Sequence, residues 1–240
     1  MDMPSEIQHQ VMGYDRTATM FSPDGHLLQV EYAEKTVRLG SSSIGIICKD
    51  GVVIISDRRV NDKLIKAESA NKLYEIDEHI IASAAGILSD ARILIEKARL
   101  ISQQNRITYD SPIDVEEVIR EIANTKQFFT QYGGARPFGV SIMVAGADNK
   151  GLHLFSSDII GNYFSYTAMA IGENDEKIKE MLRMKYSGNL NIEGGIKLAL
   201  SIFREILDKN FEISRFDVGY IPIGKKKIVR LNENSLKKLA

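Results

Sequence analysis

The sequence contains one cysteine, Cys48, among its 240 residues, so an intramolecular disulfide is excluded. Cys48 lies within an apolar segment, and this position indicates a small buried side chain rather than a reactive nucleophile. Such sparse use of cysteine favours a reducing compartment, and we therefore expect the protein in the cytoplasm.

The chain also lacks an excess of charge of either sign. Its formal net charge is −1, which gives no overall electrostatic basis for binding nucleic acid or an anionic membrane surface. The longest apolar runs, such as residues 52–55 and 80–87, are far too short to span a bilayer. The first ten residues, MDMPSEIQHQ, do not have the basic and then apolar pattern of a secretory signal. We therefore expect neither nucleic acid nor a membrane as a partner.

Motifs for metals and cofactors are missing as well. The four histidines are scattered, without the spacing of an HExxH or His/Cys site: His9, His26, His79 and His153. There is no P-loop and no GxGxxG, and Gly133-Gly134 follows a predicted helix, which is the wrong context for a phosphate cradle. The basic run 225–227 is too short for a nucleic-acid site and is typical of a solvated turn. We expect no metal and no cofactor.

The pattern of apolar residues predicts strands, two helices, strands, two helices and strands. Strands are predicted over 43–49, 52–57, 72–76, 79–84, 140–147, 152–156, 163–171, 217–223 and 228–231. Helices are predicted over 89–104, 111–130, 175–186, 192–207 and 233–239. Asp50-Gly51 between two β-branched runs is a strong hairpin signal. Strands joined by tight turns make antiparallel sheets, so the predicted class is α+β.

The segment 14–40 precedes all of these core strands. Ser22-Pro23-Asp24-Gly25 is predicted to be a turn, because proline presets φ and glycine accepts a positive φ. A helix is expected over about 26–39, with an apolar face formed by Leu27, Val30, Ala33 and Val37. Gly40 then stands where a left-handed residue commonly ends a helix. The apolar face fits either a place in the core or a subunit interface, and the terminal position of the helix favours the interface.

Several motifs resemble one family. They are Tyr14-Asp15-Arg16, FSPDG at 21–25, QVEYA at 29–33, Gly40-Ser41, SDRR at 56–59, SDARILIEKAR at 89–99 and QYGGARPFGVS at 131–141. Together they resemble proteasome α subunits of the archaeal type, in order, over about residues 14–223.

This resemblance implies a four-layer αββα sandwich of two antiparallel sheets flanked by helices, as in N-terminal nucleophile hydrolases, with an extra N-terminal helix. Residues 1–13 would form a flexible gating tail and residues 14–240 a single domain. The implied assembly is a homo-heptameric α ring that caps β subunits in an α7β7β7α7 barrel, without hydrolysing peptides itself. The implied partners are a hexameric ATPase regulator, bound through its C-terminal tails, and unfolded protein substrates in transit.

The resemblance also assigns residues to two sites. An open-gate cluster would consist of Tyr14, Asp15, Pro23 and Tyr32. A pocket for the activator tail would consist of Lys72, Gly40 and Glu31, and Lys72 would pair with the tail carboxylate. Taken by itself, Lys72 is more simply a solvent-facing lysine at the start of a strand. Relatives often carry a basic residue where this chain has Glu34, a departure that bears on which activator docks.

Two alternatives remain open. Ser41 aligns with the position of the N-terminal nucleophile, and Asp57 and Lys72 fall near the places of the assisting acid and lysine, so a self-processed hydrolase is one alternative. We favour an ordinary strand start at Ser41, because the turn and helix of 14–40 are features of a retained element. The second alternative is a stand-alone α+β domain that binds a small ligand.

Overall fold

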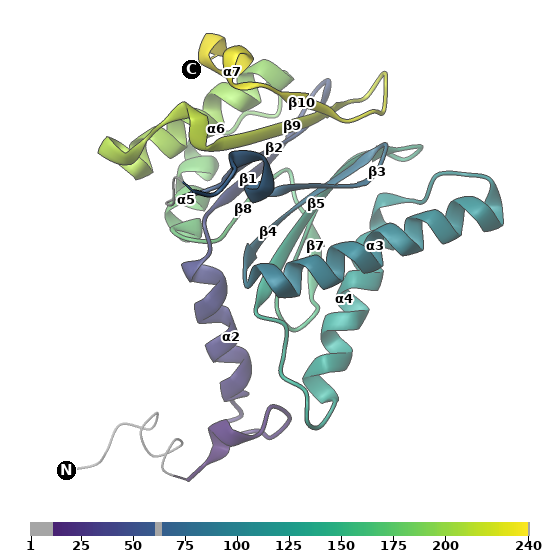
Figure 1. Ribbon diagram of the computed structural model, residues 1–240, viewed down its shortest axis with the longest axis vertical. Helices are drawn as coiled ribbons and strands as arrows, with labels where there is room; N and C mark the ends of the chain where they lie inside the picture. Colours follow the sequence, from purple (N-terminus) through teal and green to yellow (C-terminus); the bar gives the residue numbers. More distant parts are fainter. Residues whose placement is uncertain (1–11, 61–63, 240) are drawn as a thin grey trace.

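Within residues 12–60 and 64–239, which the computed structural model describes, ten strands form two five-stranded antiparallel sheets (Figure 1). The first sheet has the order β10-β9-β2-β1-β8: β1 (Ser43–Cys48), β2 (Gly51–Asp57), β8 (Ala168–Ile171), β9 (Phe216–Pro222) and β10 (Val229–Leu231). The second has the order β3-β4-β5-β6-β7: β3 (Leu73–Asp77), β4 (Ile80–Gly86), β5 (Val140–Asp148), β6 (Gly151–Ser157) and β7 (Tyr163–Ser165). The hairpin predicted at Asp50-Gly51 is confirmed, with Cys48 paired to Gly51.

The two sheets pack face to face, and helices cover both outer faces. The layer between the sheets is apolar and includes Val52, Ile54, Ile81, Met143, Ala145, Leu154 and Ile221. Helices α3 (Leu88–Tyr109) and α4 (Val115–Gln131) cover the second sheet, while α5 (Asp175–Lys185), α6 (Ile192–Leu207) and α7 (Glu233–Leu239) cover the first. The strands are therefore buried on both sides, as the fully buried β5 illustrates. The predicted four-layer αββα sandwich is confirmed.

The extra N-terminal helix, α2 (Leu28–Leu39), extends from the end of the sandwich towards a short 3-10 turn, η1 (Tyr14–Arg16) (Figure 1). Its buried residues Val30 and Ala33 pack against Ile159, in the turn between β6 and β7. The Thr36 hydroxyl donates to the carbonyl of Gly139, 2.9 Å away. The chain itself buries Val30 and Ala33, whereas Leu27 and Val37 of the same apolar face are half-buried, so the subunit interface stays a prediction.

The expectation of one strand over 163–171 is wrong. Residues 163–165 pair with β6 in the second sheet, whereas residues 168–171 pair with β1 in the first. The change of partner takes two residues: the amide of Tyr166 donates to Leu154, and the carbonyl of Thr167 accepts from Ile47, both at 2.8 Å. The hydrophobic pattern is continuous across this crossover, because both halves face apolar layers, so it gives no sign of the break.

Two expected helix boundaries also differ. Gly40 is extended, with φ −71° and ψ 143°, rather than left-handed. Glycine is required there for another reason, because a Cβ would lie 2.3 Å from the backbone nitrogen of Gly86. Ser89 does not cap α3, which begins at Leu88 and continues to Tyr109. The Asp90 carboxylate, in the first turn, is instead occupied by the guanidinium of Arg136 at 2.6 and 2.7 Å.

A lysine is fully buried beneath the turn that supports α2. Lys126, in α4, donates through Nζ to the carbonyls of Asp158 and Ser157, at 2.9 and 3.3 Å, and to the Ser157 hydroxyl at 3.3 Å. Burial lowers the pKa of Lys126 to about 7, and the negative charge of Asp158 offsets only part of that effect.

The Lys126→Met substitution should therefore alter how stability depends on pH. Below about pH 7 the folded and unfolded chains both carry the proton, and the full cost of burying the charge is present. Between about 7 and the ordinary value of 10.5 the unfolded chain binds more protons, so the wild type gains stability with rising pH. Relative to Lys126→Met, its free energy of unfolding should rise by up to about 1.4 kcal/mol per pH unit in this window.

Urea unfolding at pH 7, 8, 9 and 10 measures the effect. Lys177→Met, on the exposed side of α5, is the control and should run parallel to the wild type. Parallel curves for Lys126→Met and the wild type would show that Lys126 keeps its proton throughout this range.

Candidate functional site

The junction between α2 and β1 brings Ser41 and Lys72 into contact. Lys72 immediately precedes β3, and its main-chain amide donates to the Asp217 carboxylate of β9 at 2.8 Å. Its Nζ donates to the carbonyl of Ser41 at 2.5 Å and to the Ser41 hydroxyl at 2.8 Å. Only 4% of Lys72 is exposed, so the interpretation of Lys72 as a solvent-facing lysine is wrong.

The surroundings of Lys72 reduce its basicity. The pKa of Lys72 is lowered to about 8, chiefly by burial and also by the nearby Arg59, while Asp57 and Asp217 offset part of this effect. Two of the three N–H groups of the ammonium are used by Ser41, which leaves one for another acceptor. Lys72 is therefore a cation with a fixed direction and limited access.

The neighbouring acid, Asp57, is bound to an arginine. Asp57 ends β2 and is buried, and its carboxylate accepts from Arg215 Nε at 3.0 Å and from Arg215 Nη2 at 2.7 Å. The amide of Arg59 donates to the same carboxylate at 3.1 Å. The acid expected beside Lys72 is thus present. Its negative charge raises the pKa of Lys72, while the side chain that donates hydrogen bonds to it is Arg215.

The Gly40-Ser41 peptide is tied into the fold on both sides. The Gly40 carbonyl accepts from the amide of Glu173 at 2.7 Å, and the Ser42 hydroxyl donates to the Glu173 carbonyl at 2.5 Å. Gly172, with φ +96°, runs against the Ser41 carbonyl so closely that a Cβ there would lie 2.7 Å away.

The third residue of the expected pocket, Glu31, lies elsewhere. It is in the first turn of α2, where its carboxylate contacts Nδ1 of His26. Gly40 follows at the opposite end of the helix, about 13 Å away at 1.5 Å per residue. Within one chain the structure therefore brings Lys72 to the Gly40-Ser41 junction and leaves Glu31 apart from both.

The four residues of the expected gate cluster lie around the free end of α2. Tyr14 and Asp15 form η1, which contacts α2, and the Gln29 side chain donates to the Asp15 carbonyl at 2.5 Å. Pro23 is exposed in a turn closed by a hydrogen bond from Gly25 to Ser22 at 2.9 Å. Tyr32 is half-buried on α2. The structure gives their positions, and their role as a cluster stays a prediction.

Sequence reasoning missed the two β9-side partners of this site, Arg215 and Asp217. Arg215 bonds to Asp57, and Asp217 bonds to Lys72, although about 150 residues of sequence separate the partners. Both residues lie at the start of the last long strand, and no sequence motif marks them. The alternation of polar and apolar residues at the start of β9 is the only available signal. Their contribution is to fix the acid and the lysine in place.

Among residues 12–60 and 64–239, no three His, Cys, Asp or Glu side chains are grouped in a way that would hold a metal ion. In the same part of the chain, every helix is too short or too polar to cross a membrane.

Comparisons with known proteins cover almost the whole chain. A model of the proteasome subunit family matches residues 37–221, and a model of the N-terminal signature of A-type proteasome subunits matches residues 14–35. The chain is 43% identical to the proteasome alpha subunit of Archaeoglobus fulgidus, over 94% of this chain and 92% of the relative. It is 41% identical to that of Methanothermobacter thermautotrophicus, over 95% and 92%, and 40% identical to that of Methanosarcina thermophila, over 92% and 89%.

Proposed function

The chain belongs to the proteasome subunit family, in its alpha type, and from this premise we propose that it forms the gated end ring of a proteasome core particle. In this proposal seven copies make a homo-heptameric ring, two such rings enclose the β subunits as α7β7β7α7, and the β subunits alone hydrolyse peptides. The assembly would work in the cytoplasm on unfolded protein substrates.

The observation that supports a non-catalytic role is the Gly40-Ser41 junction. A hydrolase of this fold needs a free α-amine beside its nucleophile. Here the Gly40 carbonyl is held by Glu173 and the Ser41 carbonyl by Lys72, so the peptide bond between these residues is part of the structure that positions α2. Cleavage at Ser41 would detach α2, whose Val30 and Ala33 are buried against Ile159.

Helix α3 offers a surface for the β subunits. Ile93, Leu100 and Ile107 are exposed and stand seven residues apart, so they form one apolar stripe along the helix. Such a stripe on a helix of this length fits a helix of a partner protein. We assign it to the contact between the α and β rings.

Native mass spectrometry tests the assembly. The purified chain should form rings of seven or fourteen 26.9 kDa subunits, and its denatured mass should include residues 1–40. With β subunits co-expressed, Leu100→Glu combined with Ile107→Glu should prevent the association of α with β, because two charges would be buried at the contact. Arg92→Gln, an exposed residue of the same helix that lies about 100° round the axis from the stripe, is the control.

Two results would contradict this assignment. A mature chain that begins at Ser41 would establish the self-processed hydrolase instead. An intact monomer that ignores β subunits would favour a stand-alone binding domain.

We further propose that the C-terminal tail of an ATPase regulator binds beside Lys72, with Gly40 from the same chain and Glu31 from a neighbouring copy. Its carboxylate would accept the remaining N–H of the Lys72 ammonium. Because the lysine is almost fully buried, the charge-assisted bond would form away from water and be strong.

Lys72→Ala should reduce activator-stimulated degradation to the unstimulated rate of the same variant, while rings still form. The measurement is the hydrolysis of an unfolded protein with and without the regulator, and the exposed Lys66→Ala is the matched control. Normal stimulation of the Lys72→Ala particle would remove Lys72 from the pocket.

The gating tail, residues 1–13, falls mostly outside the described residues, which begin at Met12. We propose that it obstructs the axial pore and that Tyr14, Asp15, Pro23 and Tyr32 hold it aside when the pore opens. Deleting residues 1–12 should then raise basal peptide hydrolysis of the assembled barrel several-fold, because substrates no longer wait for the tail to move. The β active sites are counted with a covalent probe to normalise the rates. An unchanged basal rate at equal site content would exclude the tail as the gate.

A further inference from the structure

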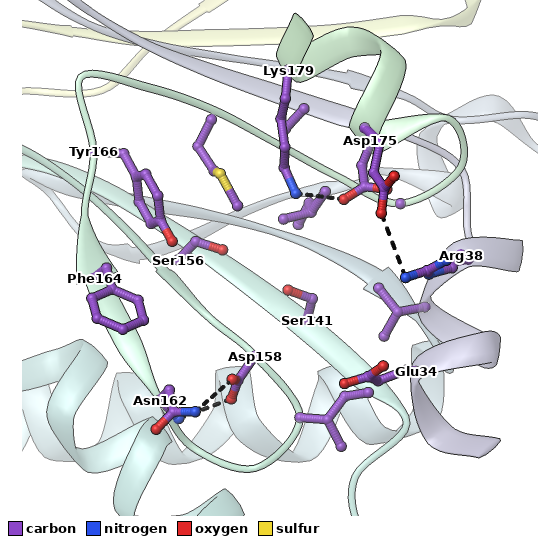
Figure 2. Close-up of a pocket in the computed structure, with 17 residues that line it drawn as sticks. Glu34, Arg38, Ser141, Ser156, Asp158, Asn162, Phe164, Tyr166, Asp175 and Lys179 are labelled. Atoms are coloured by element: carbon purple, nitrogen blue, oxygen red, sulfur yellow. Dashed lines mark hydrogen bonds and ion pairs between the residues drawn. The ribbon is translucent and has the colours of Figure 1, made fainter. Parts of the chain in front are cut away.

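A cavity of about 280 Å³ opens beside α2 (Figure 2). It lies between α2, the crossover from β7 to β8, and α5, and its walls are the apolar side chains of Val37, Ile159 and Met169. Ser141 and Ser156, on neighbouring strands of the second sheet, line it more deeply. The cavity is thus apolar at its sides and polar at its base.

The charges around the cavity are unequally matched. Its two cations each face a carboxylate of their own: Lys179 bonds to Asp175 at 2.6 Å, and Arg38 faces Glu176 at 3.6 Å. Glu34 projects from α2 towards the cavity, and no hydrogen bond or ion pair joins it to any described residue. Asp158 is a further carboxylate in the lining of the cavity.

Among the described residues, the Asp158 carboxylate accepts hydrogen bonds only from the neutral amides of Asn162, at 2.8 and 2.9 Å. Beneath it, Lys126 touches the Asp158 carbonyl, and burial brings the pKa of that lysine to about 7, so its positive charge is incomplete at neutral pH. Glu34 and Asp158 thus give the cavity a negative charge that the surrounding cations do not cancel.

A second observation concerns a hydroxyl group in the cavity that lacks a hydrogen-bonding partner. Ser156 is only 5% exposed, its side chain is directed into the cavity, and its hydroxyl has no partner among the described residues. Tyr166 presents its hydroxyl to the same space in Figure 2. The Ser156 hydroxyl is reachable from the cavity and has no partner among the described residues, so it is available to a group that enters from outside.

We propose that this cavity binds an aliphatic cation, an ammonium or guanidinium group carried on a methylene chain. The methylenes would pack against Val37, Ile159 and Met169, as the stems of long basic side chains do on apolar surfaces. The N–H groups of the cation would donate hydrogen bonds to the carboxylates of Glu34 and Asp158 and to the Ser156 hydroxyl. A free polyamine and the arginine or lysine side chain of another polypeptide share this chemistry.

Isothermal titration of the full-length chain tests the proposal with three probes: agmatine, N-acetyl-arginine N-methylamide and its uncharged citrulline counterpart. The two cations should bind, and the citrulline compound, which has nearly the same shape, should bind at least tenfold more weakly. Glu34→Gln combined with Asp158→Asn should weaken the cations at least tenfold. Glu180→Gln removes a negative charge from the exposed side of α5, outside the cavity, and should change nothing.

Glu34→Arg is a second variant, because it places a cation at the mouth and should abolish binding. Both Glu34 and Asp158 are exposed, so circular dichroism should show all variants folded as the wild type. Equal binding of the citrulline compound, or unchanged binding by the double variant, would overturn the proposal.

Agmatine binding to assembled rings distinguishes the two possible sources of the cation. This comparison rests on the proposed ring: agmatine binding that persists in rings assigns the site to a free cation, whereas binding seen only in subunits dissociated from the ring assigns it to a side chain of the neighbouring copy. Neither result depends on gating or on Lys72, so this proposal and the proposed function can fail separately.

Discussion

The close approach of α2 to the end of β4 and the start of β5 is the constraint on which both sites depend. A Cβ on Gly40 would lie 2.3 Å from the backbone nitrogen of Gly86, and a Cβ on Gly86 would lie 2.2 Å from the carbonyl of Gly139. That same carbonyl accepts from the Thr36 hydroxyl of α2 at 2.9 Å. Side chains at either glycine would push α2 away from the sandwich, so these contacts set where the helix leaves the core and where Ser41 leads into β1.

Much of this arrangement could be predicted from local sequence. Helix α6 begins at Ile192 and ends at Leu207 as its periodicity indicates, because its apolar stripe is long and its Asn191 cap accepts from Gly194. The crossover at Tyr166-Thr167 could not be predicted, because β7 and β8 are separated by hydrogen bonds to two different sheets and not by a break in the hydrophobic pattern. Nor could the extended Gly40, whose conformation is set by Gly86, far away in the chain.

The candidate site shows the same division. Alignment with the family places Ser41, Asp57 and Lys72 near one another, and the first strands do bring them together. The burial of Lys72 and the capture of Asp57 by Arg215 depend on the final long strand, whose residues carry no local signal of that role. Asp57 is bonded to Arg215, and Lys72 donates to Ser41, so both side chains help to hold the chain around Gly40-Ser41.

These contacts also connect the two regions that we assign to partners. Helix α2 carries Glu34 beside the cavity, and its C-terminal end leads directly into the Ser41 that orients Lys72. On its inner face it rests on Ile159, in a turn that Lys126 fixes from below. A group that filled the cavity would therefore touch the helix and the turn beneath it at once. Because packed interiors are hard to compress and transmit strain, a displacement of α2 by such a group would be carried along the helix to Ser41 and Lys72.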